Sequence, residues 1–146
     1  MNKTVLIIVV LIIVLGGIYY FWSTSPTEAP TGTETPVSAT VNVSNEGELA
    51  PYLVAANGMT LYIFDNDEPS VSNCYDGCAV NWPPLVADGD PVAGDGVSGV
   101  LGVTDRTDGT RQVTYNGMPL YFWINDSAPG DTTGHGVNNV WWVAVP

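Results

Sequence analysis

The stretch that decides the fold, Asn57-Gly58-Met59-Thr60-Leu61-Tyr62-Ile63-Phe64, returns later in the chain as Asn116-Gly117-Met118-Pro119-Leu120-Tyr121-Phe122-Trp123. The two stretches are 117 − 58 = 59 residues apart, and the same offset without gaps aligns Trp82 with Trp141. Agreement at aromatic and glycine positions over this distance indicates an internal duplication. Each copy of such a repeat is expected to be one supersecondary unit that completes its core with the other copy.

Strand-forming sequence dominates the chain from about residue 45 to its end. This part is dense in Val, Tyr, Trp and Thr and is broken at short intervals by Gly, Pro, Asn and Asp, which is typical of short strands and tight turns. In each copy an Asn-Gly pair separates two apolar runs, the strongest short signal for a hairpin with a type I′ turn. The predicted hairpins join Tyr52–Ala56 to Met59–Asp65 and Arg111–Tyr115 to Met118–Ile124.

Further elements complete each predicted copy. Strands are expected at Leu85–Ala87, Val100–Thr104 and Val140–Val145, and a short helical turn at Tyr75–Trp82, before two prolines that would stop it. The Asp- and Gly-rich stretch Asp88–Gly99 is expected to be a mobile loop between the copies. We therefore predict an all-β fold class. The domain, 45–146, would be a small antiparallel β sandwich or barrel-like unit made of two tandem hairpin repeats, at about 45–87 and 104–146.

An apolar segment precedes this domain. Residues 4–22 are uncharged and about long enough to cross ~30 Å of hydrocarbon. Lys3 and the terminal aromatic residues Tyr19–Trp22 favour a single-pass transmembrane anchor at 1–22 with its N-terminus in the cytoplasm. The alternative is a cleaved signal peptide, but the run is longer than a usual signal-peptide core and lacks a clear cleavage site. Residues 23–44, rich in Ser, Thr, Pro and Glu, are expected to be a disordered stalk that holds the domain off the membrane.

The charge of the chain limits its partners. All 15 Asp and Glu residues follow the apolar segment, but only 2 of the 3 Lys and Arg residues do, so this part carries 2 − 15 = −13. Such a surface repels nucleic acid and anionic lipid. We expect no nucleic-acid partner; the expected partners are the membrane, through the N-terminal helix, and an unknown envelope protein or glycan.

The two cysteines have two interpretations. Outside the cytoplasm Cys74 and Cys78 are expected to form a disulfide, since one helical turn brings their Cα atoms within bonding reach. The alternative is an envelope redox or copper-handling protein, because Cys-x3-Cys can hold Cu(I) with a sulfur or imidazole partner. Under that alternative the candidate metal ligands are Cys74, Cys78, His135, Met59 and Met118.

No recognisable catalytic set accompanies these residues. Neither copy has a nucleophile elbow or a glycine-rich phosphate loop, and catalytic groups would be expected to sit asymmetrically, in one copy only. The acidic residues Asp65, Asp67, Glu68, Asp126 and Asp131 follow the predicted strands. Turn chemistry explains such residues, and calcium binding is the alternative. We expect no enzyme activity and no cofactor.

The motif residues resemble a known family. Tyr62-x-Phe64-x-x-Asp67 and Tyr121-x-Trp123-x-x-Asp126 both match the Tyr-x-(Phe/Trp/Tyr)-x-x-Asp motif of predicted lipoproteins that are also described as a secreted repeat of unknown function. The resemblance extends to Cys74-x-x-x-Cys78-Ala79-x-x-Trp82-Pro83-Pro84-Leu85 and covers about residues 50–146. It implies a prokaryotic extracytoplasmic β-repeat domain and no established reaction. Members are typically lipid-anchored or secreted, and many carry Gln at the position of His135, which implies that this imidazole is dispensable.

These observations favour a non-enzymatic, membrane-tethered module outside the cytoplasm with a structural or interaction role. The alternatives are the redox or copper protein described above and a carbohydrate binder with an aromatic platform. The platform would use Trp82, Trp123, Trp141 or Trp142, since exposed aromatic faces mark binding surfaces.

Overall fold

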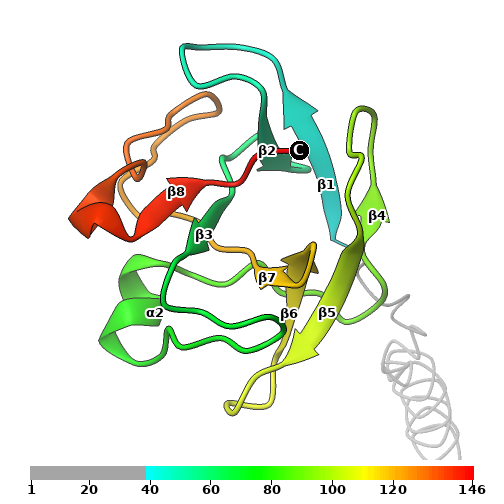
Figure 1. Ribbon diagram of the computed structural model, residues 1–146, viewed down its shortest axis with the longest axis vertical. Coiled ribbons are helices and arrows are strands. Elements are labelled where there is room, and N and C mark those ends of the chain that lie inside the picture. The colour runs from blue at the N-terminus through cyan, green and yellow to red at the C-terminus, as the bar shows by residue number, and fades with distance from the viewer. Residues whose placement is uncertain (1–38) are drawn as a thin grey trace, which may run out of the picture. The chain divides into compact units, whose positions relative to one another are not determined.

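Strands make up most of the regular structure in the computed structural model, which describes residues 39–146 (Figure 1). The elements in chain order are β1 (Thr40–Ser44), β2 (Tyr52–Ala55), β3 (Tyr62–Phe64), α2 (Gly77–Asn81), β4 (Val92–Ala93), β5 (Leu101–Asp105), β6 (Arg111–Tyr115), β7 (Met118–Pro119), the 3-10 turn Val137–Asn139 and β8 (Trp141–Val143). The all-β prediction is therefore confirmed at the level of fold class. The predicted anchor at 1–22 lies outside the described residues, and no helix within 39–146 is long and apolar enough to span a membrane.

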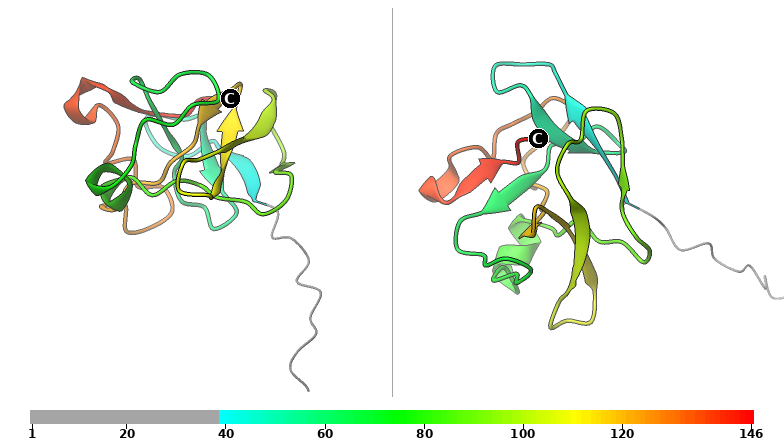
Figure 2. Two further views of the ribbon diagram at one scale, coloured as in Figure 1. Left: turned by 90° about the horizontal axis from the view of Figure 1, so that it is seen from below. Right: turned by 45° about the vertical axis from the view of Figure 1, so that its right-hand side comes forward.

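The strands form three small sheets in the described part of the chain. Their orders are β2-β1-β4, β3-β8 and β5-β6-β7, and they surround a shared centre in both views of Figure 2. Strands β1 and β2 pair antiparallel, as β5 and β6 do. Isolated bridges such as Tyr62↔Tyr121 and Val86↔Gln112 join the sheets. Each copy thus contributes a hairpin, and the bridges connect the two copies.

The predicted stalk ends too late in the chain. Residues 40–44 form β1, whose sequence Thr-Val-Asn-Val-Ser alternates polar and apolar residues, and Val41 is completely buried. The duplication itself indicates this strand, because the offset of 59 aligns the expected strand Val100–Thr104 with residues 41–45. Strand β4, inside the expected mobile loop, pairs in parallel with β1 and supplies partners for its open edge. The stalk boundary at residue 44 and the loop interpretation of Asp88–Gly99 are therefore corrected.

The two Asn-Gly turns differ in type. Asn116 and Gly117 both have positive φ, 49° and 86°, and Tyr115 pairs with Met118, so this is the predicted two-residue type I′ turn. In the first copy only Gly58 has positive φ, and Ala55 accepts a hydrogen bond from Gly58 while donating one to Met59. That pattern is a three-residue loop with one more residue than a type I′ turn. The predicted type I′ turn at Asn57-Gly58 is therefore wrong.

Beyond these turns the chains of the two copies exchange. The predicted strand Met59–Asp65 is reduced to β3, which pairs with β8 of the second copy. The corresponding segment after β7 runs beside residues 81–84 of the first copy, since Phe122 and Ile124 donate to the carbonyls of Pro83 and Asn81. The predicted strand Leu85–Ala87 is present only as isolated antiparallel bridges, in which the N–H groups of Leu85 and Ala87 donate to the carbonyls of Leu120 and Arg111. Leu85 and Ala87 are buried.

The buried side chains divide into two clusters. One is mainly aliphatic and includes Val41, Leu53, Leu61, Val113 and Leu120. The other is mainly aromatic and consists of Tyr52, Val54, Tyr62, Cys74, Trp82, Tyr121, Trp141 and Val143. Both clusters draw residues from both copies, so neither copy has a core of its own.

Candidate functional site

The tyrosines of the repeated motif meet at the centre of the domain. Tyr62 lies at the start of β3, and Tyr121 follows β7 in the second copy. Their backbones exchange two hydrogen bonds, with N···O distances of 2.9 Å and 3.0 Å. Each tyrosine donates its backbone N–H to the carbonyl of the other, so the two copies are related here by an approximate two-fold axis.

The motif side chains cross from one copy to the other. The Tyr62 hydroxyl donates to Asp126 Oδ2 and the Tyr121 hydroxyl donates to Asp67 Oδ2, both at 2.6 Å. Asp67 also accepts from the backbone N–H of Asn73, and Asp126 from the backbone N–H and hydroxyl of Thr133. The sequence predicted the motif residues but not this exchange. The motif therefore joins the two copies.

Burial sets the protonation of these groups. It is the main cause that raises the pKa of Tyr62 and of Tyr121 far above the ordinary value of 10, with the neighbouring carboxylates adding to the shift. Both tyrosines thus remain donors at neutral pH. Burial also raises the pKa of Asp67 above 3.8, because the hydrogen bonds it accepts offset only part of the lost solvation. A buried proton donor and a buried carboxylate here hold each other in place.

Four aromatic rings stack beside the crossed pairs. Their order is Phe64, Trp141, Trp82 and Trp123, with centroid distances of 4.1 Å, 3.8 Å and 4.1 Å. The rings come alternately from the first and the second copy, so each stacking contact spans the repeat. Stacked aromatic pairs add ~0.5–1.5 kcal/mol to the burial of their area. The stack therefore stabilises the association of the copies.

The predicted tryptophan platform does not have the form expected. Trp82 and Trp141 are 4% and 3% exposed, because their ring faces cover each other and are covered by Trp123 and Phe64. Trp142 is half-buried, and its indole N–H donates to Asp65 Oδ2 at 2.7 Å. No flat surface of four exposed indoles exists among the described residues.

A groove opens along the stack instead. It has a volume of about 490 Å³ and is lined by Phe64, Trp82 and Trp141 together with three asparagines, Asn66, Asn81 and Asn138, and by Cys78. The side-chain N–H of Asn81 donates to the Gly77 carbonyl, so the side-chain oxygen of Asn81 is directed away from this hydrogen bond. Asn138 has positive φ, 53°, in the 3-10 turn before β8. The groove therefore combines aromatic carbon with neutral amides, a lining suited to polar uncharged ligands.

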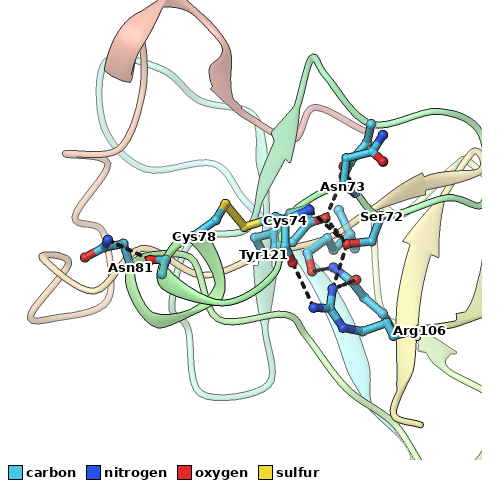
Figure 3. Close-up of a disulfide and its surroundings, with 11 residues drawn as sticks. Ser72, Asn73, Cys74, Cys78, Asn81, Arg106 and Tyr121 are labelled. Carbon is cyan, nitrogen blue, oxygen red and sulfur yellow. Dashed lines mark hydrogen bonds between the residues drawn. A yellow bond between two sulfur atoms is a disulfide. The ribbon is translucent and has the colours of Figure 1, made fainter. Parts of the chain in front are cut away.

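The predicted disulfide is confirmed. Cys74 and Cys78 are bonded, with their Cα atoms 5.2 Å apart at the start of α2. Cys74 is fully buried, whereas Cys78 is half-buried at the groove (Figure 3). The copper hypothesis needs both thiols free, and so it requires reduction of this bond.

Arg106 is the main residue that the sequence interpretation missed. Its side chain is fully buried: Nη1 donates to Ser72 Oγ and Gln112 Oε1, each at 2.7 Å, and Nη2 to the Cys74 carbonyl at 2.8 Å (Figure 3). Its Nε donates to Asp108 at 3.1 Å, where the carboxyl pKa falls to about 2 through hydrogen bonds from Thr110 first and then from the guanidinium. Arg106 is one of two arginines in a segment of charge −13, and that rarity was the available signal.

The remaining predicted site residues are not brought together. Within residues 39–146 no three His, Cys, Asp or Glu side chains form a group that could hold a metal ion. His135 lies in another pocket, where its Nδ1 accepts from the Val143 N–H. Met59 and Met118 follow two different hairpin turns. Asp131 accepts from the backbone N–H groups of Ser127 and Ala128, which is the turn chemistry expected of it.

Comparison with known proteins gives one result. The family model described as a secreted repeat of unknown function matches residues 46–86 and again residues 102–145. The two matches correspond to the two copies of the duplication. Neither the curated proteins nor the solved structures give a match.

Proposed function

The chain belongs to the family of secreted repeats of unknown function, and from this premise we propose that it is a non-enzymatic interaction module that binds its ligand in the aromatic groove. The observation that carries the proposal is the groove itself, about 490 Å³ in volume and placed where the two copies join. The family indicates an extracellular or envelope location, where such a module would meet its ligand.

The lining of the groove favours a neutral glycan as the ligand. Phe64, the half-buried ring at the end of the stack, offers apolar carbon for the face of a sugar, and the three asparagine amides both donate to and accept from hydroxyl groups. The strongly acidic domain, whose residues 45–146 carry a charge of 2 − 13 = −11, would repel an anionic polysaccharide. The groove lining has no charged side chain, which also fits a neutral ligand.

Two neighbouring asparagines provide the test. Asn138 and Asn139 both have positive φ, 53° and 56°, so glycine suits the backbone at either position, but only Asn138 lines the groove. We expect Asn138→Gly to weaken binding of neutral oligosaccharides about 3- to 10-fold, the effect of one lost hydrogen bond. Asn139→Gly is the matched control and should bind as the unmodified protein does. The measurement is calorimetric titration over a panel of neutral and anionic oligosaccharides, and equal affinity of both variants would contradict the proposal.

We further propose that residues 4–22 tether the module to the membrane, with the domain outside the cytoplasm. The support is the uncharged apolar run after Lys3 in the sequence. The full-length chain should then remain with the membrane fraction after washing with salt or alkali. Recovery of a shortened protein from the medium would contradict the tether.

A further inference from the structure

Hydrogen bonds show which residues of the two copies are structural counterparts. Leu53 donates to the Ala144 carbonyl and accepts from Leu61, just as Val113 donates to the Leu85 carbonyl and accepts from Leu120. This makes Leu53 the counterpart of Val113, an offset of 60 in this strand because of the longer first turn. Tyr52 is then the counterpart of Gln112.

The same offset holds on both sides of this strand. The ladders pair Ser44 with Tyr52 and Thr104 with Gln112, and the loops that follow Ser44 and Thr104 have equal length, so Glu48 is the counterpart of Asp108. The backbone N–H of Asn73 binds Asp67, and that of Thr133 binds Asp126. Ser72 is therefore the counterpart of Thr132.

These correspondences locate the counterpart of the Arg106 site. Arg106 belongs to the second copy, and three side chains bind its guanidinium group: Ser72, Asp108 and Gln112. Their counterparts Thr132, Glu48 and Tyr52 all line one pocket of about 330 Å³. The position of Arg106 itself is taken by Glu46, which is exposed and of opposite charge. The pocket thus repeats the side-chain oxygens of the arginine site without the cation.

An unpartnered hydroxyl supports this correspondence. Tyr52 is fully buried, and its hydroxyl oxygen is the one buried side-chain polar atom without a hydrogen-bond partner in residues 39–146. Its counterpart, Gln112 Oε1, accepts from Arg106 at 2.7 Å. Leaving a buried polar group unpaired is costly, and a donor placed as the guanidinium is placed would pair it.

We propose that this pocket binds a guanidinium group, which takes the place that Arg106 occupies in the other copy. The acceptors are the Tyr52 hydroxyl, the Thr132 hydroxyl and the Glu48 carboxylate, and the fork of guanidinium N–H donors suits several separate acceptors. A divalent metal ion fits less well, since hard cations need several carboxylate or carbonyl ligands. His135 also lines the pocket, where its Nδ1 accepts from the Val143 N–H. This site shares no lining residue with the aromatic groove.

The test is a calorimetric titration of the full-length chain with propylguanidinium, and with tetramethylammonium at the same ionic strength. We expect propylguanidinium to bind and tetramethylammonium not to bind. An acetylated Gly-Arg-Gly amide distinguishes the sources: preference for the peptide supports an arginine of a partner protein, and preference for propylguanidinium a free small molecule. Equal binding of both cations, or no binding of either guanidinium probe, would overturn the proposal.

Three variants make the test specific. Tyr52→Phe removes a hydroxyl that has no partner in residues 39–146, so thermal stability should not fall, whereas affinity for the bound probe should fall about tenfold. Glu46→Arg should fill the pocket from within, raise the melting temperature and abolish probe binding. Glu68→Arg, an equal change of charge at an exposed position that does not line the pocket, is its matched control and should retain binding. Unchanged probe affinity in Tyr52→Phe or Glu46→Arg would overturn the proposal.

Discussion

Tyr62→Phe removes one hydroxyl and keeps the ring, so it removes the hydrogen bond to Asp126 at 2.6 Å together with the longer one, at 3.3 Å, that the hydroxyl accepts from the Gly134 N–H. The Asp126 carboxylate is buried and keeps its bonds from Thr133, but it loses its shortest donor. A hydrogen bond to a charged group contributes about 1.5–3 kcal/mol. We expect the free energy of unfolding to fall by about that amount, with no added cavity. Urea denaturation measures it, and an unchanged slope of free energy against urea would show that the change lies in stability.

A double-mutant cycle then separates the crossed arrangement from a pairing within one copy. Tyr62→Phe combined with Asp126→Asn should show a coupling energy of about 1–3 kcal/mol, since the two side chains share one bond. Tyr62→Phe combined with Asp67→Asn should be additive within about 0.5 kcal/mol. Stronger coupling of Tyr62 to Asp67, the motif partner in its own copy, would refute the reasoning.

Three further outcomes follow from the described residues. Burial raises the pKa of Asp67 in the folded protein, so the stability that this group contributes is present below pH 3.8 and is lost as pH rises through the folded pKa. The unmodified protein should therefore lose stability relative to Asp67→Asn between acid and neutral pH, which denaturation at a series of pH values measures. A free energy of unfolding that depends on pH in the same way in both proteins would contradict this prediction. Reduction of Cys74–Cys78 should cost about 2 kcal/mol for so short a loop, measured by unfolding with and without reductant, and alkylation of non-reduced protein would contradict the disulfide. His135→Gln should change stability by no more than about 0.5 kcal/mol, because glutamine can also accept from the Val143 N–H. A larger loss would show that the hydrogen bond between the His135 imidazole and β8 stabilises the fold.

The local features of the fold could be predicted from the sequence. The strands β2, β5, β6 and β8, the helical turn before the two prolines and the disulfide all follow from short-range patterns of residue type and spacing. The motif residues were also identified. Their signal lies in neighbouring residues, which the sequence shows directly.

The partners of the motif side chains could not be predicted. Tyr62 and Asp67 lie five residues apart in one motif, yet each bonds to the other copy. This pairing depends on how β3 passes β8, which is a long-range property that residue spacing does not contain. The groove likewise combines residues from 64–66, 77–82 and 138–141, three segments that only the fold brings together.

Two features were accessible but missed. The repeat offset applied to Val100–Thr104 indicates β1 within the expected stalk. Comparison of the copies also shows that Arg106 has no basic counterpart in the loop 45–51. A duplication thus informs in two ways, since its agreements locate the shared fold and its differences locate the positions where the copies serve different purposes.

The central claim is that the two copies form one domain by exchanging their motif side chains and aromatic rings. Near-ultraviolet circular dichroism of separately produced residues 39–99 and 100–146 tests it most directly, because Trp82 and Trp141 stack only across the copies. We expect each half alone to give a flat near-ultraviolet spectrum, since both buried clusters draw their residues from both halves, and the mixed halves to recover the spectrum of the whole domain. A structured spectrum and cooperative unfolding from either half alone would contradict the claim.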